Sequence, residues 1–287
     1  MTPPAIYRSV AGEQAVQARY DALLARWPVP YQALHIPTRY GETFVIDSGS
    51  QAAQPLVLLH GAGTNSAMWA GDVAEYSRHY RVLAIDLLGE AGKSAPNRMD
   101  WAGPAYAEWL DEVLQSLGIK AVTLIGLSQG AWTALKFAIY TPASVTALVA
   151  LSPAGIVPDK LSFVSRALPL SLLGGWGIRR INRLVLGGQS VPAEIEETMT
   201  LNMTHFKTRV GVVPLFSDDE LRRLRMPVQL VIGRRDALRD AEKIAARMQQ
   251  LVPQLTPTII PDAGHALINS RAYILPFLAA TASGAPV

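Results

Sequence analysis

The chain of 287 residues contains no cysteine. This absence excludes a disulfide framework, a thiolate nucleophile and a zinc site with sulfur ligands. Whatever chemistry the protein performs must therefore come from Ser, His, Asp, Glu or Lys. No metal and no cofactor are expected.

A large excess of charge of one sign is also lacking. Lys and Arg together number 26 against 23 Asp and Glu, which gives a net charge of +3. The pI of about 9.2 is in the range of nucleic-acid-binding proteins. A surplus of three charges over a chain of this size produces a weak field, however. We therefore expect no nucleic-acid partner and attribute the pI to surface composition.

Long hydrophobic runs are missing too. Arg8, Glu13 and Arg19 interrupt the N-terminal region where a signal peptide needs an apolar stretch. No run approaches the roughly 18 to 20 apolar residues that span a bilayer. These absences predict a cytoplasmic protein without a membrane partner. They do not indicate an oligomeric state.

Short apolar runs of β type alternate with helical patterns along most of the chain. After a helix predicted at about residues 9–27, strands are expected at residues 43–47, 56–59, 80–86, 122–126, 145–151, 228–232 and 258–260. Helical patterns occupy residues 105–117, 129–140 and 241–251. Strands that alternate with crossover helices predict an α/β fold with a doubly wound, mainly parallel sheet.

One segment, residues 154–225, interrupts this alternation. It contains helical patterns at residues 161–173, 178–186 and 193–207 and no convincing strand. We interpret it as a helical insertion over the sheet. Residues 1–153 and 226–287 would then form a single core domain.

The sharpest motif is Gly126-Leu127-Ser128-Gln129-Gly130, which lies directly after a predicted strand and before a predicted helix. This is the G-x-S-x-G nucleophile elbow in its strand–turn–helix context. A Cβ on either glycine would collide with the neighbouring strand or helix. Ser128 is therefore predicted to be a nucleophile at the carboxyl edge of the sheet. The structural alternative is an ordinary turn with Ser128 as the N-cap of a helix.

A serine nucleophile needs a base, and the base needs a carboxylate that orients it. Among the five histidines, His265 follows the last apolar run, which is the chain position expected of the base. Asp236 follows the strand at residues 228–232 and is the favoured acid, with Asp240 and Asp262 as lesser candidates. A helix N-cap or surface ion pair for Asp236, and a loop role for His265, are the structural alternatives.

An oxyanion intermediate needs two backbone N–H donors. Gln129, the residue after the nucleophile, is expected to supply one of them. The second is assigned to Ala62 in the glycine-rich loop after the strand at residues 56–59, with Gly63 as the alternative. His60 is expected to orient this loop through hydrogen bonds.

Five motifs together resemble the α/β-hydrolase superfamily. They are Leu58-Leu59-His60-Gly61, the turn from Asp86 to Ser94, the elbow at Ser128, Gly233-Arg234-Arg235-Asp236 and Asp262-Ala263-Gly264-His265. The N-terminal helix, the entry at residues 38–43, Met68-Trp69 and the Asp86 turn are similar to bacterial carboxylesterases of the naproxen esterase group. The turn has one more residue between Gly89 and Gly92 than the usual family pattern. The resemblance implies that residues 154–225 form a cap over the active site.

The resemblance implies an esterase with a Ser-His-Asp triad that acts on a small-molecule ester and water. Hydrolysis of lactones, thioesters or carbon–carbon bonds, and perhydrolysis, remain alternatives with the same residues. Serine at the elbow argues against haloalkane dehalogenase and epoxide hydrolase, because similar members carry aspartate there.

An apolar substrate pocket without a charged anchor is expected from large side chains in the predicted cap and near the elbow. The candidates are Met68, Trp69, Trp132, Leu161, Phe163, Trp176, Met203 and Phe206. At helical spacing, such residues are more often core than pocket.

Two interpretations from other classes remain. Gly61-Ala62-Gly63 with Asp86 partly imitates a dinucleotide-binding fingerprint, although the third glycine is absent. A non-catalytic small-molecule receptor could use the same fold. Both leave the serine, histidine and aspartate without a role.

Overall fold

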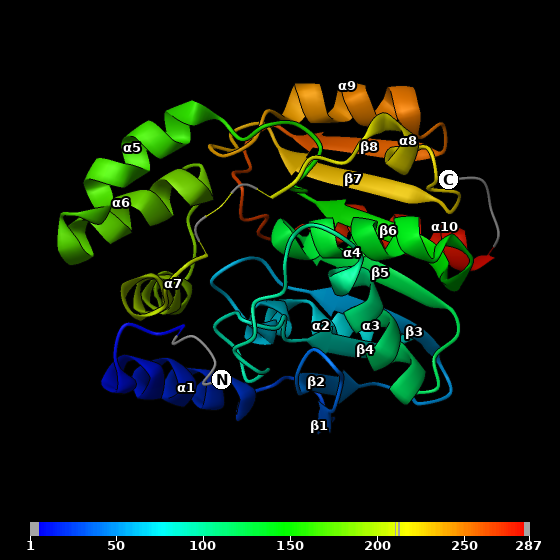
Figure 1. The fold of residues 1–287 in the computed structure, drawn as a ribbon, viewed down its shortest axis with the longest axis horizontal. Helices are drawn as coiled ribbons and strands as arrows, with labels where there is room; N and C mark the ends of the chain where they lie inside the picture. Colours follow the sequence, from blue (N-terminus) through cyan, green and yellow to red (C-terminus); the bar gives the residue numbers. More distant parts are fainter. Residues whose placement is uncertain (1–5, 210, 212, 284–287) are drawn as a thin grey trace.

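A computed structural model describes residues 6–209, 211 and 213–283. The outermost residues of the expected core, 1–5 and 284–287, and residues 210 and 212 of the expected insertion lie outside the described residues. The fold is built on one sheet of eight strands in the order β1-β2-β4-β3-β5-β6-β7-β8 (Figure 1). The strands are β1 (Tyr31–Ile36), β2 (Thr43–Ser48), β3 (Gln54–Leu59), β4 (Tyr80–Ile85), β5 (Val122–Leu127), β6 (Val145–Leu151), β7 (Val228–Gly233) and β8 (Leu255–Ile260).

The sheet is parallel from β4 to β8, and β1 and β2 add an antiparallel hairpin at one edge. The predicted fold class, α/β with a mainly parallel sheet, is therefore confirmed. β1 is absent from the sequence prediction because none of its side chains is buried. An exposed edge strand lacks the apolar run that identifies the central strands.

Helices cover both faces of the sheet (Figure 1). They are α1 (Val10–Leu24), α2 (Val73–Tyr76), α3 (Ala105–Ser116), α4 (Gln129–Tyr140), α5 (Leu161–Ser171), α6 (Gly174–Leu186), α7 (Ala193–His205), α8 (Asp218–Leu221), α9 (Ala241–Leu251) and α10 (Arg271–Ser283), with 3₁₀ turns at Ser66–Gly71 and Pro142–Ser144. Within the described ranges, no helix has the length and apolar content of a membrane span.

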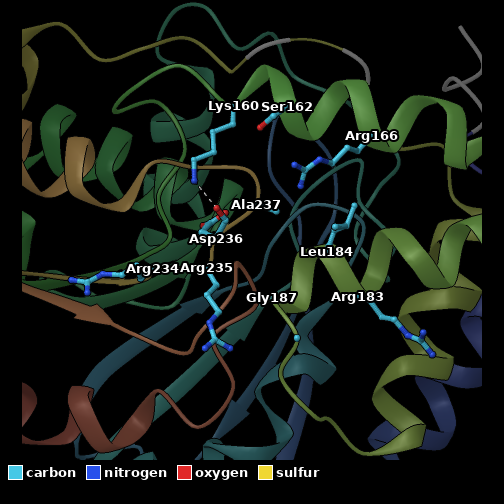
Figure 2. A pocket seen from close by; sticks show the side chains of 11 residues that line it. Lys160, Ser162, Arg166, Arg183, Leu184, Gly187, Arg234, Arg235, Asp236 and Ala237 are labelled. Carbon is cyan, nitrogen blue, oxygen red and sulfur yellow. Dashed lines mark hydrogen bonds between the residues drawn. The ribbon is translucent and has the colours of Figure 1, made fainter.

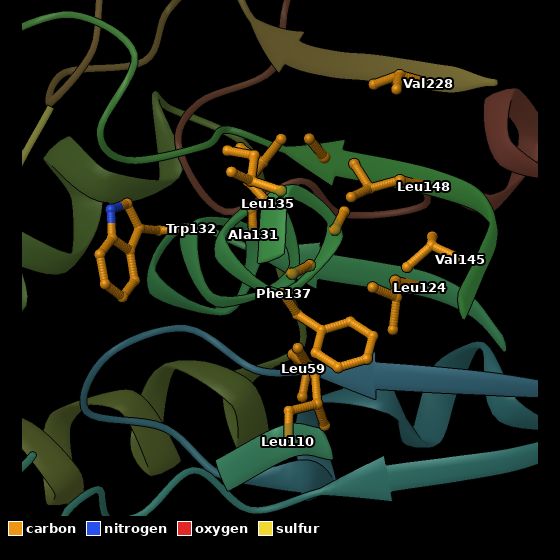
Figure 3. Packing of buried hydrophobic residues seen from close by; sticks show 14 of the residues in the cluster. Leu59, Leu110, Leu124, Ala131, Trp132, Leu135, Phe137, Val145, Leu148 and Val228 are labelled. Carbon is orange, nitrogen blue, oxygen red and sulfur yellow. The ribbon is translucent and has the colours of Figure 1, made fainter. Parts of the chain in front are cut away.

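The two faces of the sheet bury separate hydrophobic clusters, since successive strand side chains point to opposite faces. In β3, Val57 and Leu59 join the cluster with α3, α4 and α9, whereas Leu56 and Leu58 join the cluster with α1, α2 and α10. Figure 3 shows members of the first cluster around α4, including Leu135 and Phe137 of that helix. This packing fixes α4, and with it the turn that precedes the helix.

Residues 154–225 contain α5 to α8, and the described part of this segment contributes no strand to the sheet. α7 packs against α1 and α6. Arg19 of α1 donates hydrogen bonds to Thr198 Oγ1 at 2.9 Å and to the Glu194 carbonyl at 3.0 Å. α5 packs on α6, and none of its residues is buried. Figure 1 shows α5 and α6 side by side at the periphery, away from the sheet.

Candidate active site

Ser128 sits in the turn between β5 and α4. Its backbone has φ 56° and ψ −109°, a conformation that residues with a Cβ rarely adopt. A Cβ on Gly126 would overlap the Gly130 carbonyl, and one on Gly130 would overlap the Leu59 carbonyl. The two glycines thus let strand, turn and helix approach closely enough to hold Ser128 at the carboxyl end of β5. Such strain is typical of functional sites.

His265 and Asp236 meet at the same edge of the sheet, beyond β8 and β7. The His265 Nδ1 atom lies 2.8 Å from Asp236 Oδ2, and both side chains are buried. Asp236 Oδ1 accepts hydrogen bonds from the backbone N–H groups of Leu238 and Arg239 at 2.8 and 2.9 Å. Burial acts to raise the pKa of Asp236, but the charge and hydrogen bond of His265, followed by Arg239, lower it overall. The carboxylate is therefore held ionised beside the imidazole.

The other two candidate acids have different partners. Asp240 accepts a hydrogen bond from the Lys243 N–H at the start of α9, and Asp262 forms an ion pair with Arg235. Of the three, the structure brings Asp236 to His265.

The backbone around His265 is fastened to the end of α6. The His265 N–H donates to the Val185 carbonyl at 2.8 Å. Gly264 packs directly against the backbone of Leu186 and Gly187, where a Cβ would overlap. The last turn of α6 therefore holds the loop that carries His265 in position.

Arg239 is a neighbour of His265 that sequence reasoning missed. Its side chain is buried, and Nη1 lies 3.1 Å from His265 Nε2 and 3.2 Å from Nδ1. Among the described residues, Nε2 has Arg239 and not the Ser128 hydroxyl as its hydrogen-bond partner. Burial is the main cause of a lowered pKa for Arg239, while Asp159 and Asp236 act in the opposite direction. Nothing in the local sequence distinguishes this arginine from Arg234 and Arg235.

The loop after β3 is held by two buried side chains. His60 Nδ1 lies 2.8 Å from the Gly61 carbonyl, and its Nε2 accepts from the Leu87 N–H at 2.9 Å. These are loop-orienting contacts of the kind expected for His60. Burial lowers the pKa of His60, although Asp86 and the Gly61 hydrogen bond oppose this effect. The ring is therefore neutral and structural in character.

Glu90 is the second buried side chain. Its Oε2 accepts a hydrogen bond from the Gly63 N–H at 2.7 Å. The Gly63 N–H, which was the alternative oxyanion donor to Ala62, is therefore already occupied. The Ala62 and Gln129 N–H groups have no hydrogen-bond partner among the described residues. Sequence reasoning missed Glu90, although it lies in the stretch between Gly89 and Gly92 that carries the added residue. That departure from the family pattern was the one signal that could have found it.

The ionisation of Glu90 makes stability depend on pH. Burial raises the pKa of Glu90 from 4.5 to about 7, although Gly63, Gln129, Arg98 and Arg209 favour the charged form. Because the folded state holds the Glu90 proton more tightly than the unfolded state does, the contribution of Glu90 to the free energy of unfolding is greatest below about pH 4.5. This contribution is lost as the pH rises through 7. The loss is about 3 kcal/mol for a shift of this size.

We predict that Glu90→Gln removes this loss, because a glutamine oxygen can still accept the Gly63 N–H. The difference in unfolding free energy between variant and wild type, measured in urea, should change by about 3 kcal/mol between pH 4.5 and pH 8. Glu197→Gln on the exposed face of α7 is the control. An equal difference at both pH values would contradict the prediction.

The eight candidate pocket residues do not come together as one lining. Trp69, Trp132 and Phe206 are buried in three different hydrophobic clusters. Leu161 and Trp176 are exposed. Met68 is exposed beside Thr64, and Phe163 and Met203 are half-buried. Trp132 instead packs on Trp101, Tyr106 and Phe216 and donates to the Pro214 carbonyl.

A cavity of about 410 Å³ lies between the α5–α6 pair and the turn after β7 (Figure 2). Its lining is basic, in contrast to the apolar pocket expected from the sequence. It includes Lys160, Arg166, Arg183, Arg234 and Arg235, and it reaches Asp236. Lys160 donates to the Asp236 carbonyl at 2.8 Å, drawn as a dashed line in Figure 2.

Asp86 has contacts that disagree with a nucleotide-binding role. Its Oδ1 accepts from the Tyr20 hydroxyl and the Ser66 N–H, and its Oδ2 accepts from the Lys93 N–H. The carboxylate is wholly buried. It therefore joins α1 to two loops and presents no oxygen to a ribose.

Comparison with known proteins agrees with the fold. Residues 56–273 match the model of the alpha/beta hydrolase family. The chain belongs to this family, and it is a hydrolase.

The members of the family that the chain resembles include carboxylesterases of Bacillus subtilis. The chain is 34% identical to "Uncharacterized carboxylesterase nap" over 257 residues, covering 86% of this chain and 85% of that protein. It is 31% identical to "Carboxylesterase YbfK" over 264 residues, covering 86% of each. The crystal structure of naproxen esterase (carboxylesterase NP) from B. subtilis superposes with a TM-score of 0.83 at 30% identity, covering 95% of this chain and 98% of that one. The resemblance noted from the sequence is therefore confirmed.

Proposed function

We propose that the protein is a serine carboxylesterase that works through an acyl-enzyme, with Ser128 as nucleophile, His265 as general base and Asp236 as the orienting acid. The observation that carries the proposal is the buried His265–Asp236 hydrogen bond of 2.8 Å at the sheet edge where Ser128 emerges. The relatives named carboxylesterase supply the class of substrate.

In the first step, Ser128 Oγ bonds to the ester carbonyl carbon while its proton passes to His265 Nε2. The carbonyl oxygen becomes an oxyanion, which the N–H groups of Ala62 and Gln129 stabilise. His265 Nε2 can accept one hydrogen in the ring plane. Arg239 Nη1 and the serine hydroxyl are therefore alternative donors, and Arg239 must yield that position during turnover.

The oxyanion then collapses, the carbon–oxygen bond to the alcohol breaks, and His265 returns its proton to the leaving alkoxide. Water, activated by His265, attacks the acyl-enzyme in the same manner and releases the acid and the free serine. Asp236 remains ionised throughout and stabilises the imidazolium. Residues 154–225 act as a cap over this site.

A substrate panel tests the reaction class. We expect uncharged aryl and alkyl esters to be hydrolysed with a higher kcat/KM than a matched thioester or lactone. The panel should vary the acyl chain length at constant leaving group. A higher kcat/KM for the lactone or the thioester would reassign the reaction, and absence of any turnover would favour a receptor.

A further inference from the structure

The α5–α6 pair, here called the cap hairpin and spanning residues 161–186, exposes an unusual amount of apolar surface. Six of the thirteen exposed large hydrophobic side chains in the described chain lie between residues 161 and 176: Leu161, Val164, Leu168, Leu172, Leu173 and Trp176. Leu161 and Leu172 are 83% and 82% exposed. A concentration of exposed apolar side chains on one short segment is typical of an interaction surface.

Residues 160–193, which contain the cap hairpin, carry a concentrated positive charge. Between Asp159 and Glu194 there are one lysine and four arginines, Lys160, Arg166, Arg179, Arg180 and Arg183, and no acidic residue. The rest of the chain has 21 basic and 23 acidic residues, a net charge of −2. The high pI therefore comes from this one segment and not from the surface as a whole.

The four arginines of the cap hairpin are available to an external partner. All four arginines are exposed, and in the described chain none of them forms an ion pair with a carboxylate. Arg180 lies over the Trp176 ring at 5.1 Å. Arg166 and Arg183 also line the cavity that reaches Asp236 (Figure 2).

We propose that the cap hairpin docks on the surface of an anionic lipid bilayer. Leucine and tryptophan side chains beside unpaired arginines, with no acidic residue, are the composition of helices that lie in a membrane interface. The apolar side chains would enter the headgroup–acyl boundary, and the arginines would pair with lipid phosphates. This mode needs no spanning helix. It departs from the sequence expectation of no membrane partner, which rested on the lack of a long apolar run.

The charge favours a lipid surface over a second copy of the chain. Two cap hairpins facing each other would bring together eight arginines and no carboxylate. Like charges in contact destabilise an interface unless counterions intervene. An anionic bilayer instead complements both the arginines and the apolar side chains.

Vesicle cosedimentation tests this proposal without requiring turnover. The purified full chain is mixed with vesicles of phosphatidylcholine alone or of phosphatidylcholine and phosphatidylglycerol. We expect about tenfold or stronger partitioning onto the anionic vesicles and a marked decrease at high salt. Because binding is measured directly, the result does not depend on the proposed esterase activity.

Two variants separate the apolar and the charged contributions. Leu168→Ser/Leu172→Ser and Arg179→Glu/Arg180→Glu should each lower partitioning onto the anionic vesicles by about tenfold or more. The matched controls are Val10→Ser, which removes an apolar side chain 72% exposed on α1, and Arg223→Glu/Arg225→Glu, which changes the net charge equally elsewhere. Circular dichroism verifies that each variant is folded.

Three results would overturn the proposal. One is a failure of the wild-type protein to bind either vesicle. Another is an equal loss of binding in the Arg223/Arg225 control, which would mean unspecific charge attraction. The third is a concentration-dependent dimer that Leu168→Ser/Leu172→Ser dissociates while vesicle binding is unchanged, which would assign the patch to self-association.

Discussion

Replacing Ser128 by alanine is expected to lower kcat for a short aryl ester by about a million-fold, the loss typical of removing a serine nucleophile. Stability should change little, because alanine carries the same Cβ as serine in the strained φ 56° conformation. The measurement is initial rate at saturating ester, together with thermal unfolding of both proteins. A folded variant that hydrolyses the ester within tenfold of the wild-type rate would remove Ser128 from the mechanism.

Ser152 offers a matched control for this experiment. It follows the neighbouring strand β6, is fully buried and also has a positive φ of 41°. Its hydroxyl has no hydrogen-bond partner among the described residues. Ser152→Ala should therefore leave kcat unchanged and should not lower stability.

Asp236→Asn should lower kcat by about 10⁴-fold with little change in fold, a loss of the size seen when an orienting aspartate becomes an amide. The asparagine Oδ1 can still accept the Leu238 and Arg239 N–H groups. Its amide nitrogen faces His265 Nδ1 and can only donate. The ring must then carry its proton on Nε2, where it cannot accept the serine proton.

Asp240→Asn and Asp262→Asn are the informative comparisons, since both carboxylates were candidates for the same role. Each should retain kcat within a few-fold of wild type, because one caps α9 and the other pairs with Arg235. A collapse of kcat in either variant, with Asp236→Asn active, would transfer the acid role to that residue.

The central strands could be predicted because burial on both faces demands continuous apolar runs, as in β5 and β7. β1 could not, since its exposed side chains resemble a loop. In the cap hairpin, leucines at helical spacing indicate that a helix has an apolar face. The spacing does not indicate whether another part of the protein covers that face. The sequence interpretation of Leu161 as core or pocket differs from the exposure of 83% that the structure gives it.

The residues of the candidate site also fall into those that the sequence predicts and those that it does not. Ser128, Asp236 and His265 each lie in a short sequence motif from which their role could be predicted. Glu90 and Arg239 depend on contacts that tertiary folding creates, with Gly63 27 residues away and with His265 26 residues away. No short-range pattern encodes such a pairing, so single-sequence reasoning does not reach it.

The hydrogen bond from His265 to the Val185 carbonyl bears on how this enzyme could be engineered. One way to alter the protein is to exchange its cap hairpin for the corresponding segment of a homologous enzyme. Here the graft would have to keep the last turn of α6 and its contact with Gly264. A chimera in which the foreign segment ends before Val185 keeps the carbonyl that binds the His265 N–H. A chimera in which the foreign segment continues past Val185 replaces that contact.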